Sequence, residues 1–326
     1  MKEASDTNDL IQQKDDILDE YKNKIQKVLQ KDTNEKLIEY NSNVITLYGY
    51  WEQFVENIIN EYVTEINSIS ISAEIKHEDY RKQIFNLFNR IEKSNPKFKN
   101  IKEEDIIESL YSVVINKQNK YIAQAFYQSG GNYNCEEIAK CFKSIGISDF
   151  ESKLKLYPSM KSYFKKENNS DYRSANLFAK LDYFVSLRNE VAHGGGQNMI
   201  SPDEFIPYVE FFESMSNGIN EYIEDKFNEL KWKSIGNDEI KVSHFYDKIE
   251  ISELEKKTFK IDTTKSLMYK KETSSYPKYA FAKIISIKIN NEIFGGKLLT
   301  VNSDQKVTLK FTEPLKRNYV IKFLNS

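Results

Sequence analysis

An arginine, a carboxamide and a histidine stand close together in one stretch of the chain. Arg188 and Asn189 are adjacent, four residues separate Arg188 from His193, and three glycines follow. Only five of the 47 basic residues are arginines. An arginine here therefore indicates a task that lysine does poorly, such as a planar two-pronged grip on a phosphate. With a histidine able to move protons nearby, the group suits phosphate-ester chemistry without a metal.

The residues around this group predict a helix over 171–193. Phe184 and Arg188 fall on one stripe of that helix, so the arginine interrupts an apolar face. A buried guanidinium needs a carboxylate partner, or it lines a cleft or an interface. Two interpretations stay open at this point. The arginine and His193 act on a ligand, or the arginine pairs with an acid such as Glu52 while the histidine only caps its helix.

The elements that must position this group read as helices up to about residue 230. Apolar residues recur there at three- and four-residue steps, which is typical of amphipathic helices. Ser201 and Pro202, followed by two acids, predict the start of the last helix. The predicted helices cover residues 10–29, 44–67, 75–94, 102–127, 135–144, 171–193 and 202–230.

After Trp232 the hydrophobic period changes to two, which is typical of strands. The alternating runs cover residues 240–244, 249–251, 259–261, 282–284, 285–289, 307–311 and, less regularly, 320–323. Residues 290–292 and 302–304 are predicted as turns between such runs. The sequence therefore predicts a multidomain α+β protein. An all-α helical bundle over residues 1–232 precedes a small, mostly β domain over residues 233–326, which fits a sandwich or a barrel equally well.

The two predicted domains differ in charge. Residues 231–326 carry 19 Lys and Arg against 11 Asp and Glu, a net charge of +8, whereas the first 230 carry 28 against 38. A basic domain favours a polyanion such as RNA. The candidate contacts with the RNA backbone are the lysine pairs Lys256–Lys257 and Lys270–Lys271. An acidic protein partner and a merely soluble, lysine-rich surface are the alternatives.

Other candidates for chemistry are few. The cysteines, Cys135 and Cys141, have no second pair to complete a zinc site, so we expect free thiols and no metal or cofactor. His244 continues the alternation of its strand and is expected on a partly buried sheet surface, with base stacking beside Tyr246 as the alternative. No apolar run approaches the length of a membrane span, and the polar, acidic N-terminus is unlike a secretory signal. We therefore expect a cytoplasmic protein without a membrane partner.

Two segments together resemble the HEPN family. The family's mark is an arginine, usually followed by a polar residue, and then a histidine after a gap of four to six residues. Arg188–His193 fits this pattern with a gap of four. The earlier segment Leu47–Val55 contains a Trp-Glu-x-Phe core like that of the long helix in bacterial members. The resemblance covers about residues 8–230, and the C-terminal part resembles no family that we can name.

This resemblance implies a helical bundle that forms homodimers in which the arginine–histidine segments of two protomers face each other. Many members are metal-independent ribonucleases of toxin–antitoxin or antiviral systems. Carried onto this chain, His193 acts as general acid or base while a ribose 2′-hydroxyl attacks its own phosphate. Arg188 stabilises charge on the phosphoryl oxygens, and Asn189 orients one of these groups. Glu52 and Glu190 are the expected supporting residues.

The sequence leaves three hypotheses for function. The first is an endoribonuclease that acts on RNA as a homodimer, with an antitoxin or a phage-derived trigger protein as a further partner. The second is a non-catalytic HEPN scaffold that uses the same polar group to bind RNA, a nucleotide or a protein. The third is a structural helical adaptor, in which Arg188 serves folding alone.

Overall fold

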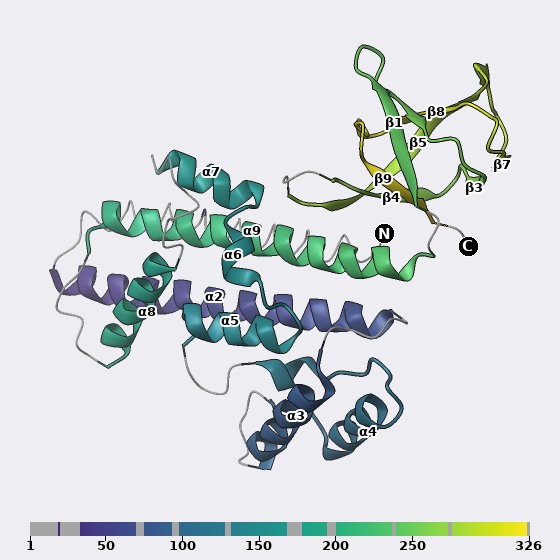
Figure 1. Cartoon of the computed structure of the whole chain (residues 1–326). Helices are drawn as coiled ribbons and strands as arrows, with labels where there is room; N and C mark the ends of the chain where they lie inside the picture. The colour runs from purple at the N-terminus through teal and green to yellow at the C-terminus, as the bar shows by residue number, and fades with distance from the viewer. Residues whose placement is uncertain are drawn as a thin grey trace. The chain divides into compact units, whose positions relative to one another are not determined.

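The computed structural model divides into two compact units, residues 1–223 and 224–326. Figure 1 shows helices in the first unit and strands in the second. The helical bundle followed by a small β domain confirms the predicted fold class. The structure describes residues 33–69, 75–92, 98–127, 132–167, 178–193, 200–236, 239–272 and 276–324, together with Asp19. The predicted helix over residues 10–29 lies outside these residues, Asp19 excepted.

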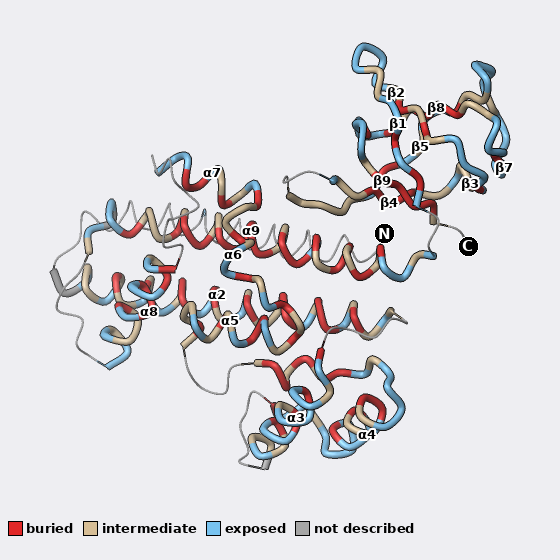
Figure 2. The backbone as a smooth tube through the Cα atoms, in the orientation of Figure 1, coloured by how far each residue is buried: buried red, intermediate tan, exposed pale blue. Residues whose placement is uncertain are grey.

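Two long parallel helices form the core of the first unit. Helix α2 (Thr33–Ser68) carries an almost unbroken buried stripe, because its apolar residues recur every three or four positions. The buried residues recur along it from Tyr40 to Ile66 (Figure 2). Trp51 lies 5.2 Å from Phe212 of helix α9 (Pro202–Ser234), measured between ring centroids. Replacing such a buried aromatic residue with alanine costs about 3–5 kcal/mol of stability. The α2–α9 pair is therefore a rigid support for shorter elements.

The shorter elements of the first unit pack around this pair. They are α3 (His77–Glu92), α4 (Glu103–Val114), the 3₁₀ helix η3 (Ala123–Phe126), α5 (Cys135–Ser144), α6 (Phe150–Leu154), α7 (Pro158–Lys166) and α8 (Ala179–Ala192). The predicted helices at residues 75–94 and 135–144 are confirmed within two residues. Helices α6 and α7 were not predicted. Ser201 and Glu204 form reciprocal side-chain bonds at the start of α9, as the sequence indicated.

The predicted helix over residues 102–127 is wrong, because α4 ends at Val114. Beyond it the chain turns back to α2. The Asn67 amide bonds the backbone N–H and carbonyl of Tyr121, at 2.9 Å each, and Asn119 donates to the carbonyl oxygens of Ile66 and Ile69. These bonds satisfy the C-terminal end of α2 and hold residues 119–122 in an extended path. A tertiary contact thus overrides the local helical pattern.

The second unit is a closed antiparallel barrel, which settles the choice between sandwich and barrel. Its strands are β1 (Ile240–Tyr246), β2 (Ile251–Leu254), β3 (Phe259–Asp262), β4 (Ser266–Lys270), β5 (Tyr279–Ile289), β6 (Glu292–Ile293), β7 (Leu298–Val301), β8 (Val307–Phe311) and β9 (Val320–Phe323). Six of them pair in the order β4-β9-β1-β2-β8-β5, and β5 pairs back with β4. Closure removes the exposed edges of these strands. The predicted turns at residues 290–292 and 302–304 lie where expected.

The end of α9 is part of the second unit, since the division between units falls inside this helix. The Asp225 carboxylate accepts hydrogen bonds from the backbone N–H groups of Lys278 and Tyr279, at 2.7 and 2.8 Å. The ammonium of Lys322, a buried residue, donates to the carbonyl oxygens of Trp232 and Ile235, at 3.0 and 3.1 Å. A cation at these carbonyls satisfies acceptors that a helix end leaves unpaired. The barrel therefore caps the last turn of α9.

Candidate active site

Helix α8 positions the predicted group at its C-terminal end. Leu181, Phe184 and Leu187 are buried and anchor the helix in the bundle. The Phe184 ring centroid lies 4.9 Å from that of Phe212 in α9. This anchoring fixes the position of Arg188, one residue beyond the last buried leucine. The arginine is only partly buried.

The Arg188 guanidinium is held by two amides and one ring. Its Nη1 donates to Asn132 Oδ1 at 3.0 Å and to Asn189 Oδ1 at 3.1 Å. Its Cζ lies 4.5 Å from the centroid of the Tyr48 ring, which is within the range of a cation–π contact. Its Nε is buried and has no hydrogen-bond partner among the described residues. Nη2 makes no hydrogen bond with the described residues, so its N–H groups are available as donors.

Helix α2 fixes the two residues that hold the arginine. The Tyr133 backbone N–H donates to Tyr48 Oη at 2.7 Å, and Trp51 Nε1 donates to the Tyr133 carbonyl at 3.0 Å. The Tyr133 hydroxyl donates to Glu56 at 2.9 Å. The backbone on both sides of the Tyr133 Cα is thus held by Tyr48 and Trp51, which are one turn apart on α2, and this places the preceding Asn132 against the guanidinium. Burial raises the pKa of Tyr48 to about 12, so its phenol stays neutral at physiological pH.

His193 lies at the exposed end of α8. Its backbone N–H donates to the Asn189 carbonyl at 3.0 Å, and the residue forms the C-cap of the helix. Its imidazole makes no hydrogen bond, ion pair or ring contact with the residues that the structure describes. The structure therefore brings Arg188 and Asn189 together and leaves the His193 side chain open to solvent. Gly194 to Gly196, predicted to end the helix, lie outside the described residues.

The predicted supporting acids lie on different sides of this group. Glu52 stands one turn after Tyr48 on α2 and is partly buried. Its charge and that of Arg188 act on the pKa of Tyr48 in opposite directions, so both lie near the same phenol. Its direct support of the arginine stays a prediction. Glu190 is exposed. Burial is the main cause that raises the pKa of Tyr40, and the charge of Glu190 adds to it.

The four predicted lysines lie in the second unit, in two separate places. Lys256 and Lys257 are exposed between β2 and β3, where the Lys257 ammonium donates to the Glu239 carbonyl at 2.9 Å. Lys270 ends β4, with its Nζ 6.0 Å from the centroid of the Tyr279 ring, and Lys271 follows it. Both are partly buried. Their role toward RNA stays a prediction.

Three residues of the site were not predicted from the sequence: Asn132, Tyr48 and Tyr133. Tyr48 belongs to the segment that carries the resemblance, but its position in a buried stripe gave it no separate signal. Asn132 lies in an irregular segment, and its contact with Arg188 spans 56 residues of sequence. No local pattern marks such a contact.

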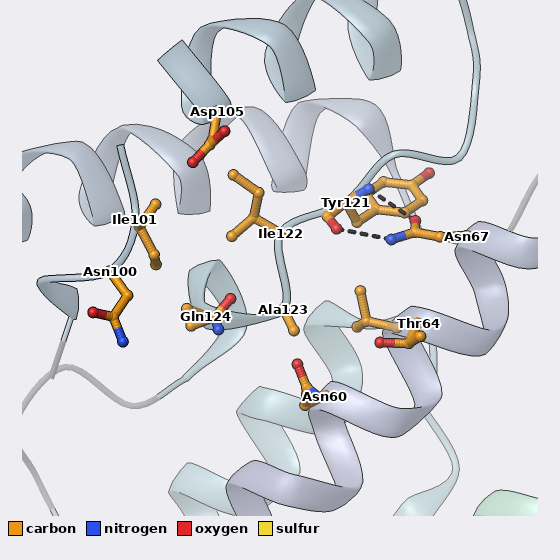
Figure 3. A pocket seen from close by; sticks show the side chains of 11 residues that line it. Asn60, Thr64, Asn67, Asn100, Ile101, Asp105, Tyr121, Ile122, Ala123 and Gln124 are labelled. Atoms are coloured by element: carbon orange, nitrogen blue, oxygen red, sulfur yellow. Dashed lines mark hydrogen bonds between the residues drawn. The ribbon is translucent and has the colours of Figure 1, made fainter. Parts of the chain in front are cut away.

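A separate hollow of about 310 Å³ lies farther along α2 (Figure 3). Asn60 on its wall is 12 residues from Tyr48, which is about 18 Å along the helix. Its lining residues are Asn60, Val63, Thr64, Asn67, Asn100, Ile101, Asp105, Tyr121, Ile122, Ala123 and Gln124. Figure 3 shows that the Asn67 amide faces the Tyr121 backbone, to which it is bonded. The lining contains no lysine, arginine or histidine, so it offers no side-chain cation to a phosphate.

Two general features of the described residues bear on the predicted class of protein. No helix among them is long and apolar enough to cross a membrane. No cluster of three or more histidine, cysteine, aspartate or glutamate side chains with the geometry of a metal site is present among them. Both cysteines are free thiols: Cys141 is buried and Cys135 is partly buried.

Comparison with known proteins identifies the first unit. A family model described as RiboL-PSP-HEPN matches residues 8–225 and confirms the resemblance expected over residues 8–230. The match includes the α2 segment around Trp51 and the end of α8 with Arg188. Neither the curated proteins nor the solved structures returned a match to the chain. Because the matched region makes up 218 of the 326 residues, the protein belongs to the RiboL-PSP-HEPN family.

Proposed function

We propose that this protein is an endoribonuclease that cleaves RNA by attack of a ribose 2′-hydroxyl on the adjacent phosphate, without a metal ion. The observation that carries this proposal is the placement of Arg188. Tyr48 and Asn132 hold its guanidinium at the edge of the bundle, and the exposed His193 ends the same helix. A fixed cation and an imidazole supply the two functions that this reaction needs, charge stabilisation and proton transfer.

In the proposed reaction the 2′-oxygen bonds to phosphorus and the 5′-oxygen leaves. The products are a 2′,3′-cyclic phosphate and a 5′-hydroxyl end. The attacking hydroxyl loses one proton and the leaving oxygen gains one, and His193 performs one of these transfers. Arg188 stabilises the charge on the phosphoryl oxygens through Nη2, while Asn189 orients the guanidinium through Nη1. DNA lacks the attacking hydroxyl and is not a substrate.

We place the active centre between two copies of the chain. Within the described part of one chain His193 is exposed to solvent, and its imidazole makes no hydrogen bond to Arg188. In the proposed dimer, the C-terminal end of α8 from a second protomer faces that of the first. His193 of one protomer then acts together with Arg188 of the other. The homodimer is therefore part of the proposal. In each protomer, Glu52 and Glu190 support the C-terminal end of α8.

A toxin or antiphage-defence role in the cytoplasm completes the proposal. It rests on membership of the family and on the expected RNA substrate. In such a system the chain has an antitoxin or a phage-derived trigger protein as a partner. Expression in bacteria tests this role, because an active toxin slows growth and His193→Ala restores it.

One observation favours the second hypothesis, a non-catalytic scaffold. Within the described residues, the two hydrogen bonds of the Arg188 guanidinium go to the carboxamides of Asn132 and Asn189, and its Nε is buried. Such an arginine could hold a nucleotide or RNA without turnover. The two hypotheses differ in one respect: a scaffold binds RNA and leaves it intact.

Cleavage of total cellular RNA by the purified protein in EDTA tests the proposal. We expect discrete fragments with 2′,3′-cyclic phosphate ends from the wild type, and none from Arg188→Ala or His193→Ala. The control is Glu136→Gln, a change at an exposed residue of α5, which leaves cleavage intact. Intact RNA in the presence of the folded wild-type dimer contradicts the proposal and favours the scaffold.

A further inference from the structure

We propose that the outer face of the barrel binds single-stranded RNA through two aromatic rings and two lysines. Four neighbouring strands build this face, in the order β1, β2, β8 and β5. The contact residues are His244 and Tyr246 on β1, Lys288 on β5 and Lys310 on β8. This surface belongs to the second unit, and it binds RNA whether or not α8 cleaves it.

Strand register sets the side chains in two rows across the face. Successive cross-strand partners are His244, Glu253, Thr308 and Lys288 in one row, and Tyr246, Ile251, Lys310 and Ser286 in the next. All eight are exposed or partly exposed, whereas the intervening Ser252, Ile287 and Leu309 are buried. The rows therefore face outward. Strands lie about 4.8 Å apart, so β1, which carries the rings, lies about 14 Å from β5 and about 10 Å from β8, which carry the lysines.

The Tyr246 ring is fixed in place before any ligand arrives. Its hydroxyl donates to Glu253 Oε2 at 2.7 Å, and the Lys306 ammonium lies 2.9 Å from the same oxygen. Burial disfavours ionisation of Glu253, but these two bonds outweigh it and lower the pKa of its carboxyl. His244 packs edge-on against Tyr246, with 4.4 Å between ring centroids. A base can stack on rings held this way at little cost in side-chain entropy.

The charges beside the rings favour RNA over an acidic peptide. Lys306 is neutralised by Glu253. Lys288 and Lys310 form no ion pair within the described part of the chain, so their charges are available to phosphates. An acidic peptide would satisfy these lysines but would leave the exposed rings without a partner. Single-stranded RNA presents bases to the rings and phosphates to the lysines at once.

Affinity for a short fluorescent single-stranded RNA, measured by anisotropy on the full chain, tests this proposal. All proteins carry His193→Ala so that no RNA is cleaved during the measurement. We expect Tyr246→Ala to weaken binding about 10-fold, and Tyr246→Phe to retain most of it because the ring remains. The double variant Lys288→Glu, Lys310→Glu should weaken binding about 10-fold or more and reduce its dependence on salt.

The matched control is the double variant Lys260→Glu, Lys297→Glu, which makes the same change in charge on exposed lysines of the same unit outside the face. We expect it to bind RNA nearly as well as the parent. Equal losses in both double variants, unchanged binding after Tyr246→Ala, tighter binding of poly-glutamate than of RNA, or no RNA binding would each overturn the proposal. Because binding is measured without cleavage, a failure of the ribonuclease proposal leaves this result interpretable.

Discussion

The guanidinium of Arg188 lies over the ring of Tyr48, with Cζ 4.5 Å from the ring centroid. The arginine comes from α8 and the tyrosine from α2, so the contact ties the end of one helix to the middle of another. The same tyrosine accepts the Tyr133 N–H, which places the Asn132 amide against Nη1 of the guanidinium. The position of the proposed cation therefore depends on α8, on α2 and on the segment that contains Asn132.

Asn132→Ala should lower the rate of RNA cleavage about 10-fold while the protein remains folded. The change removes one of the two acceptors of Arg188 Nη1, so the guanidinium is less well oriented toward a phosphate. The measurement is cleavage under single-turnover conditions. Asn134→Ala is the matched control, because the Asn134 side chain only caps α5 by accepting from the Glu137 N–H. It should cost about 1 kcal/mol of stability and leave the rate unchanged. Equal rates for the two variants would show that Asn132 does not orient the arginine.

Arg188→Met should abolish cleavage and change the free energy of unfolding by less than about 2 kcal/mol. Methionine keeps apolar contact with Tyr48 and removes a donor, Nε, that is buried without a partner among the residues the structure describes. Arg188→Lys should also be inactive, since an ammonium cannot bond Asn132, Asn189 and a phosphate in one plane. Urea unfolding and cleavage assays on the same preparations separate the two effects. A loss of stability well above that bound would favour the structural adaptor.

Cleavage should depend on dimer formation. If the α8 ends of two protomers make one centre, sedimentation at assay concentrations gives twice the mass of one chain. Specific activity then falls on dilution below the dissociation constant. An enzyme that sediments as a single chain and keeps its specific activity on dilution would refute the shared centre.

Both cysteines should react slowly with iodoacetamide. Burial raises the pKa of Cys141 to about 12, and burial together with the charge of Glu151 raises that of Cys135 to about 12. Since the thiolate is the reactive form, raising a thiol pKa from its ordinary 9 to 12 reduces the thiolate fraction at pH 8 about 1000-fold and slows the reaction. Mass spectrometry at pH 8 measures the modified fraction. Urea-unfolded protein should react at the ordinary rate, and rapid labelling of the folded chain would contradict the burial.

How far the sequence determines the structure can be judged from individual residues. The helices around Trp51 and Phe212 were predicted, because helical periodicity reports burial on one face directly. Strand β4 was missed because Leu267, Met268 and Tyr269 are all buried, so no alternation marks it.

His244 was expected on a partly buried sheet surface, and this was wrong. The strand shifts its register between Val242 and His244, and this irregularity turns the histidine outward. In the candidate site, Arg188 and His193 were visible because their types and spacing are local. Asn132 was not, because only the folded chain brings it to the arginine.

In the proposed reaction the nucleophile is a ribose 2′-hydroxyl. Once a cleavage site has been mapped, the most direct test is a synthetic RNA in which that nucleotide alone carries 2′-hydrogen. The wild-type protein should cut the all-ribose RNA in EDTA and leave the substituted RNA intact at that bond. Cleavage of the substituted RNA at the same bond and rate would contradict it.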